Sequence, residues 1–132
     1  MQKTIYILVS IILLISCNTN TSTNDLKLNN GKKWKVNEEM KPHIDKGSEI
    51  LSTYLAKNNN THQALAGELK QLNNDLIKSC TMKGESHDEL HKWLHPHMKL
   101  IQKLSNIDDS KQANAVVLEI EQSFKTYHTF FE

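Results

Sequence analysis

The chain has 132 residues and a formal net charge of +1, because 16 basic side chains are nearly balanced by 15 acidic ones. All of the basic residues are lysines, so the bidentate guanidinium contacts that recognise phosphate groups are missing. The lysines are also scattered along the sequence, and together these features argue against nucleic-acid binding. Beyond the N-terminal region, about 100 residues remain, which is enough for one small domain.

Residues 1–16 are typical of a secretory signal peptide. Lys3 precedes an apolar run over residues 5–15 that is too short for an ordinary membrane-spanning helix. The ending Leu14-Ile15-Ser16-Cys17 resembles the bacterial lipobox. This resemblance implies cleavage before Cys17, a diacylglyceryl group on its thiol, and a domain held at a bacterial membrane on the periplasmic or extracellular side. The alternative is a plain signal peptide followed by an incidental cysteine.

Residues 17–36 connect the lipidated cysteine to the folded domain. Residues 18–25 contain no large apolar side chain, which predicts a flexible tether. In residues 26–36, lysines surround a few apolar residues and an Asn29-Asn30-Gly31 turn signal. We expect an irregular lead-in whose Trp34 packs on the end of the domain.

Residues 37–132 begin with two amphipathic helices. Asn37 is the predicted cap of the first, and Pro42 places its regular start either at Glu38 or near Lys41. Its apolar stripe comprises Met40, Ile44, Leu51 and Leu55. The second helix follows Thr61, and its inward seam comprises Leu65, Leu69, Leu72 and Leu76, with Cys80 on the edge. Gly84 suits the left-handed position that follows a last helical turn.

Two further helices complete the pattern. Ser86 and Glu89 have the spacing of a capping box at the start of the third, and Pro96 should kink it. The seam of this helix comprises His87, Leu90, Leu94, His97, Ile101 and Leu104. Residues 108–110 offer caps for the fourth helix, whose seam comprises Ala113, Val117, Ile120, Phe124, Tyr127 and Phe131. Four such helices with short connections predict an all-α, antiparallel up-down-up-down bundle.

The connection between the second and third helices is rich in potential metal ligands. In the predicted bundle, the start of helix one and the end of helix four lie at this same end. The topology therefore gathers seven such residues there: Met40, His43, Cys80, Met82, His87, His91 and His128. Among the other histidines, His62 belongs to the opposite end, His95 should face solvent, and His97 should face the seam.

Metal chemistry accounts for such a gathering. His87 and His91 are four residues apart on a helix, so both imidazoles can point to one ion. His43 and the Cys80 thiolate would complete a tetrahedral set for zinc, whereas thioethers from Met40 or Met82 would favour copper. Taken singly, each of these residues is more often a surface, capping or packing residue. Their convergence predicts a copper or zinc site formed by His43, Cys80, His87 and His91.

A second resemblance suggests haem. Met40 near the start of helix one, with Thr126-Tyr127-His128 near the end of helix four, is similar to the arrangement in periplasmic four-helix b-type cytochromes. The resemblance implies axial ligation of haem iron by Met40 and His128. The chain departs from that pattern because Cys80, His87 and His91 have no counterpart in it, and it has no Cys-x-x-Cys-His motif for covalent haem.

The chain also looks like a group of small bacterial lipoproteins with Trp-Lys-Val-Asn-Glu-Glu-Met and Cys-Thr-Met-Lys-Gly runs, a likeness that implies no activity. Three functions therefore stay open. The first is a membrane-anchored metal-binding lipoprotein, and the second is a b-type haem protein. The third is a structural lipoprotein whose helices meet another envelope protein. An enzyme is least expected, because the sequence has no acid pair, nucleophile elbow or phosphate loop.

Overall fold

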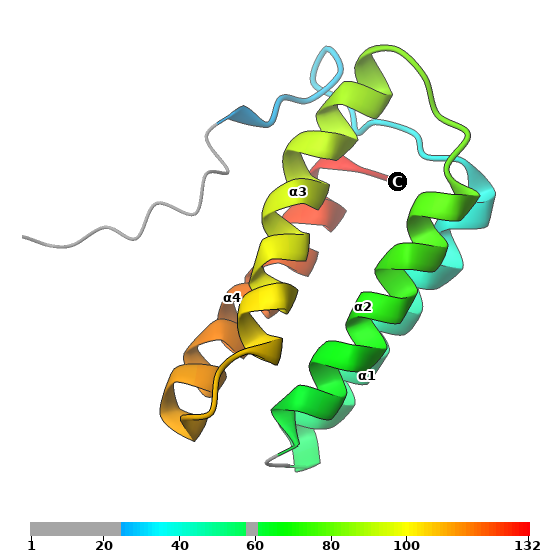
Figure 1. The fold of residues 1–132 in the computed structure, drawn as a ribbon. Helices are drawn as coiled ribbons and strands as arrows, with labels where there is room; N and C mark the ends of the chain where they lie inside the picture. The colour runs from blue at the N-terminus through cyan, green and yellow to red at the C-terminus, as the bar shows by residue number, and fades with distance from the viewer. Residues whose placement is uncertain (1–24, 58–60) are drawn as a thin grey trace, which may run out of the picture.

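The computed structural model describes residues 25–57 and 61–132. After a short 3-10 helix, η2 (Glu38–Met40), four helices follow: α1 (Lys41–Lys57), α2 (His62–Ser79), α3 (Glu85–Ser105) and α4 (Ser110–Phe130). Consecutive helices pack side by side and run in alternating directions (Figure 1). The predicted all-α antiparallel bundle is confirmed. The predicted signal peptide, the lipidation site Cys17 and most of the tether lie outside the described residues.

The core is built from the seams that the sequence predicts. All six seam residues of α4 are buried, and so are five of the six seam residues of α3. The exceptions are His87 and Leu72, which are half-buried, and Leu55, which is 37% exposed. Within the described ranges, no helix has both the length and the apolar character needed to cross a membrane.

The start of the first helix follows the second of the two predicted alternatives. η2 forms one tight turn, and α1 begins at Lys41 with Pro42 as its second residue, where the missing N–H costs no helical hydrogen bond. Asn37 precedes η2 but makes no capping bond with its side chain. Instead, its amide donates to the Ser79 carbonyl over 2.9 Å and accepts from the Thr81 N–H over 3.1 Å. Asn37 therefore joins the start of α1 to the corner after α2.

That corner differs from the prediction in two details. α2 ends at Ser79, so Cys80 is an extended residue and not part of the helix. Gly84 does adopt a positive φ of 67°, but it directly precedes α3 and does not cap the end of α2. The predicted capping box is wrong. Ser86 donates to the Lys83 carbonyl, and the Glu89 carboxylate turns away to bind the lead-in.

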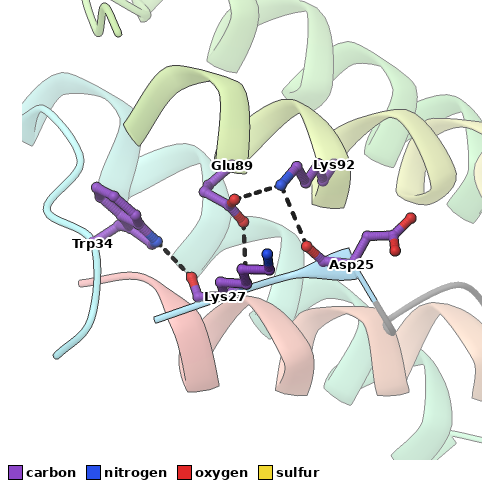
Figure 2. Close-up of polar contacts among 5 residues, drawn as sticks. All are labelled: Asp25, Lys27, Trp34, Glu89 and Lys92. Carbon is purple, nitrogen blue, oxygen red and sulfur yellow. Dashed lines mark hydrogen bonds and ion pairs between the residues drawn. The ribbon is translucent and has the colours of Figure 1, made fainter. Parts of the chain in front are cut away.

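The lead-in is fixed to α3 and to the C-terminal segment. Glu89 accepts the Lys27 N–H over 3.1 Å and forms an ion pair with Lys92, and Lys92 also donates to the Asp25 carbonyl (Figure 2). The Trp34 indole donates to the Lys27 carbonyl over 2.6 Å. As expected, Trp34 is half-buried and packs against the core.

Backbone pairing completes the attachment of the lead-in. Trp34 forms a parallel bridge with Phe131, in which the Trp34 N–H donates to the Phe130 carbonyl over 2.8 Å. The Glu132 N–H donates to the Trp34 carbonyl over 2.9 Å. Leu26 and Val36, which belong to the same lead-in, bury their side chains in the core. The lead-in is therefore part of the packed domain, although the sequence places the domain boundary at residue 37.

The opposite end of the bundle is closed by different contacts. The His62 ring nitrogen lies 2.7 Å from the Ile107 carbonyl, which ties the start of α2 to the loop before α4. Asp109 caps α4 by accepting the Gln112 N–H over 2.8 Å, as one of the predicted caps. The placement of His62 away from the other histidines agrees with the prediction.

Two helical glycines give a matched test of this packing. A Cβ on Gly47 would lie 2.8 Å from Phe124 Cζ, whereas a Cβ on Gly67 would meet no atom within 4 Å. We expect Gly47→Ala to lower the free energy of unfolding by about 1–2 kcal/mol, because overpacking outweighs the gain in helix propensity. Gly67→Ala should raise it by about 0.5–1 kcal/mol. Urea denaturation measures both, and a stabilised Gly47→Ala protein would contradict the close α1–α4 contact.

Candidate metal site on α3

Three histidines form a ladder along one face of α3. His87, His91 and His95 are spaced four residues apart, so successive rings are neighbours on the helix surface. His91 Nε2 lies 3.0 Å from His87 Nε2, and His91 Nδ1 lies 2.9 Å from His95 Nε2. The ring centroids are 4.4 Å and 4.8 Å apart, and each pair meets edge to face. We call these three residues the histidine ladder.

The hydrogen bonds of the ladder depend on protonation. A neutral imidazole has one donor and one acceptor nitrogen, so a neutral His91 can donate to only one neighbour and must accept from the other. Burial, followed by the proximity of His87 and His95, lowers the pKa of His91, while Asp88 opposes the shift. At neutral pH the central ring is therefore uncharged, which is the form that binds metal.

The nitrogen pairs of the ladder are close to a chelating separation. Two imidazole nitrogens bound to one tetrahedral Zn²⁺ at about 2.0–2.1 Å lie roughly 3.3 Å apart. The His87–His91 pair, at 3.0 Å, needs to open by a few tenths of an ångström, and both rings must turn so that their lone pairs converge on an ion beside the N–N line. An ion placed between these rings would replace the shared proton.

The three rings do not converge on one point. His91 uses Nε2 toward His87 and Nδ1 toward His95, and these atoms lie on different sides of its ring. One ion can therefore take His91 with either neighbour but not with both. In residues 25–57 and 61–132, no three His, Cys, Asp or Glu side chains are placed to hold a metal ion together.

The other predicted zinc ligands have separate surroundings. Cys80 is a half-buried free thiol that packs against the core, and His43 is half-buried near the start of α1. Neither makes a hydrogen bond to the ladder in the described part of the chain. The structure thus brings His87 and His91 into contact, and ligation by His43 and Cys80 stays a prediction.

The predicted soft ligands and the haem pair are distributed differently. Met40 is 1% exposed within the core, and Met82 is half-buried against the core. His128 is exposed on α4, with its ring edge against buried Tyr127. Met40 therefore faces inward and His128 faces solvent. Axial ligation of haem by these two residues stays a prediction.

His97 lies apart from the ladder, inside the core. It is 0% exposed, stacks on Trp93 at 4.7 Å, and meets the Phe124 ring edge-on. Its Nδ1 lies 2.8 Å from Ser123 Oγ, whereas Nε2 has no hydrogen-bond partner in the described residues. Burial lowers the pKa of His97 to about 3. This environment makes His97 a neutral core residue, as its position in the predicted seam indicates.

His95 belongs to the ladder, although sequence reasoning assigned it only a secondary place as a ligand. It is exposed, as expected for a position outside the seam, yet its Nε2 is bonded to His91. The signal was available in the regular spacing of His87, His91 and His95. Because His95 lies off the inward seam, the predicted four-ligand set did not include it.

No family model, curated protein or solved structure matches the chain. Function must therefore be argued from the side chains and their geometry.

Proposed function

We propose that this protein is a membrane-anchored lipoprotein that binds copper or zinc through the histidine ladder of α3. The lipid on Cys17 would hold the domain at a bacterial membrane, outside the cytoplasm. His87 and His91 would be the principal ligands, with His95 offering a second pairing with His91. Imidazole suits both copper and zinc, so the ligand type does not separate the two metals.

The observation that carries this proposal is the 3.0 Å separation of His87 Nε2 and His91 Nε2. The two nitrogens already face each other on a rigid helix, so little conformational freedom is lost when an ion enters. Both side chains are half-buried, and burial lowers the pKa of His91, which keeps its nitrogens available near neutral pH.

Two imidazoles leave the remaining coordination positions of an ion open. Closed structural zinc sites use four protein ligands, whereas open sites keep positions for water or another donor. An open pair favours a role in acquiring or transferring metal over a role in stabilising the fold. His43 and Cys80 are the predicted additional ligands, and their contribution can be tested separately.

A chelator-competition titration with Zn²⁺ and Cu²⁺ tests the site. His91 belongs to both pairs, so His91→Ala should weaken binding by at least the 10- to 100-fold that is typical for loss of an outer-shell partner. His128→Ala is the matched control, because it removes an exposed histidine from another helix. Equal affinity of wild type and His91→Ala would overturn the ladder as the site. A loss in Cys80→Ala as large as in His91→Ala would support the four-ligand set.

Metal affinity should fall in acid. Imidazole nitrogens must lose their protons to bind metal, and the pKa of His91 lies below the ordinary histidine value of about 6.5. We expect affinity to be steady above about pH 7 and to weaken once the pH drops below about 6, as protons compete with the metal for imidazole nitrogen. Isothermal titration at pH 5, 6, 7 and 8 checks this, and a flat profile would argue against imidazole ligation.

A further inference from the structure

Charge is divided unevenly between the lead-in and the rest of the domain. Residues 25–36 contain four lysines and one aspartate, which gives a net charge of +3. Residues 37–132 contain 11 lysines and 14 acidic residues, which gives −3. Although lysines are scattered through the chain as a whole, the segment nearest to Cys17 is therefore basic and the bundle is acidic.

The lead-in lysines are presented on an exposed turn. Asn29 and Lys32 pair across a tight turn in which Asn30 and Gly31 have positive φ values of 50° and 81°. The lysines that follow the turn line one open hollow of about 480 Å³, together with Lys83 from the corner before α3. The charged groups that line this hollow are Lys32, Lys33, Lys35, Lys83, Glu85 and Glu132.

This hollow keeps a positive excess. Four lysines face two glutamates, and none of the four forms an ion pair among the described residues. Leu28, which directly precedes the same turn in the sequence, is 39% exposed. An exposed leucine beside unpaired lysines suits a surface with both negative charge and apolar chains, which is the character of an anionic lipid bilayer.

The position of the tether adds an independent reason. Eight residue steps separate Cys17 from Asp25, so the first described residue lies no more than about 27 Å from the lipidated cysteine. Asp25 and Lys27 are attached to α3 through Lys92 and Glu89 (Figure 2). The turn that carries Lys32, Lys33 and Lys35, which we call the lysine turn, is thus fixed to the domain near Asp25. It lies at the end of the bundle that carries the start of α3 (Figure 1).

We infer that this turn, with Lys32, Lys33, Lys35 and the exposed Leu28, is a docking surface for the anionic lipids of the membrane to which Cys17 is attached. The inference rests on the lipid anchor in the proposed function and adds an orientation to it. The two acyl chains of a diacylglyceryl group already give stable attachment, so a basic patch beside the anchor would chiefly set the orientation of the domain on the membrane. Each lysine near an anionic membrane contributes about a fivefold gain in partitioning.

Amine labelling of the full-length lipidated protein on vesicles tests the inference. A membrane-impermeant acetylating reagent is applied on vesicles of phosphatidylcholine and on vesicles that also contain 30% phosphatidylglycerol. On the anionic vesicles we expect Lys32, Lys33 and Lys35 to react several-fold more slowly, and 0.5 M NaCl should restore their rates, because salt screens the attraction. Lys57, Lys103 and Lys111 are exposed at the other end of the bundle and should react equally on both vesicles.

Variants and flotation separate this inference from the anchor itself. Lys83 lines the same hollow and should also be labelled more slowly on anionic vesicles. Replacing Lys32, Lys33 and Lys35 by Gln should abolish this slowing at Lys83, whereas the same change at Lys57, Lys103 and Lys111 should leave it intact. Flotation with neutral vesicles reports the lipid anchor alone. Protein that floats with both vesicle types, but labels at the same rate on both, overturns the docking surface and leaves the anchor standing. Protein that floats with neither overturns both.

Discussion

Acidification from pH 7 to pH 4 should lower the free energy of unfolding by about 3 kcal/mol through His97 alone. Burial lowers the pKa of this side chain to about 3, whereas in the unfolded chain it titrates near 6.5. Between these two pKa values, the His97 side chain therefore binds a proton in the unfolded state but not in the folded state. The stabilisation is fully present above about pH 6.5 and is lost as the pH falls toward 3.

The structural cause is burial without a charged partner: among the described residues, only the Ser123 hydroxyl hydrogen-bonds the His97 ring, and no carboxylate pairs with it. Trp93 and Phe124 cover the faces and edge of His97, and Ser123 bonds only one nitrogen. The second nitrogen, Nε2, has no partner in the described residues, so a proton there would be both buried and unsolvated. Protonation must therefore be coupled to opening of the α3–α4 contact.

Chemical denaturation at pH 7, 6, 5 and 4 measures the effect. Carboxylates also titrate in this range, so the informative quantity is the difference in slope between wild type and His97→Leu, which keeps a similar volume without a titrating group. His128→Gln is the matched control, because it removes an exposed histidine and should keep the wild-type slope. Parallel slopes for wild type and His97→Leu would contradict the buried neutral imidazole.

The same residue illustrates what the sequence could predict. His97 follows Leu90 and Leu94 in a regular apolar spacing, and the periodicity alone placed it in the core. The seam of α4 was equally accurate, with every member from Ala113 to Phe131 buried. Helical periodicity fixes which face turns inward, and short connections then leave few ways to pack four such faces.

Polar side chains near helix starts were less predictable. Asn37 and Glu89 both have the residue type and position of capping groups, yet each bonds a segment more than 40 residues away. A local pattern specifies a cap only if no tertiary partner competes for the same oxygen or nitrogen. Asn37 hydrogen-bonds the backbone on both sides of Cys80, and Glu89 hydrogen-bonds the lead-in. Neither contact can be predicted from the residues next to Asn37 or Glu89 in the sequence.

The candidate site was predictable in part for a related reason. Contacts within one helix follow from spacing, so the adjacency of His87 and His91 on α3 could be read from the sequence, while their joint ligation of an ion stays a prediction. The distance of His43 and Cys80 from that pair depends on how three helix ends pack together. Topology predicts only that these residues lie at the same end of the bundle. The rotation of each helix about its axis determines whether a side chain points toward the site. Met40 illustrates this, because its side chain points into the core.

Removal of the Glu89 carboxylate should release the lead-in and cost about 2 kcal/mol of stability. Glu89 is 8% exposed and satisfies both the Lys27 N–H and the Lys92 ammonium (Figure 2). Burial alone would raise the pKa of Glu89, but its bonds with Lys92 and Lys27 outweigh burial and hold the pKa below the ordinary value. In Glu89→Ala these donors lose their acceptor, and breaking a buried, hydrogen-bonded ion pair typically costs several kcal/mol. The expected loss of stability is at the lower end of that range, because the Lys92 side chain is 41% exposed and its ammonium can be solvated by water instead.

Amide hydrogen exchange distinguishes this local release from general weakening. In Glu89→Ala, the Lys27 amide should exchange much faster relative to the core amides of α3, because it loses its only acceptor in the described residues. Glu85→Ala is the matched control: it removes an exposed carboxylate one turn earlier that forms no ion pair with the described residues, and it should change stability by less than about 0.5 kcal/mol. Unchanged Lys27 exchange in Glu89→Ala would mean that the backbone pairing of Trp34 with Phe131 holds the lead-in by itself. If the exchange does rise, Glu89 is the residue that holds the lead-in from Asp25 to Lys27 on α3.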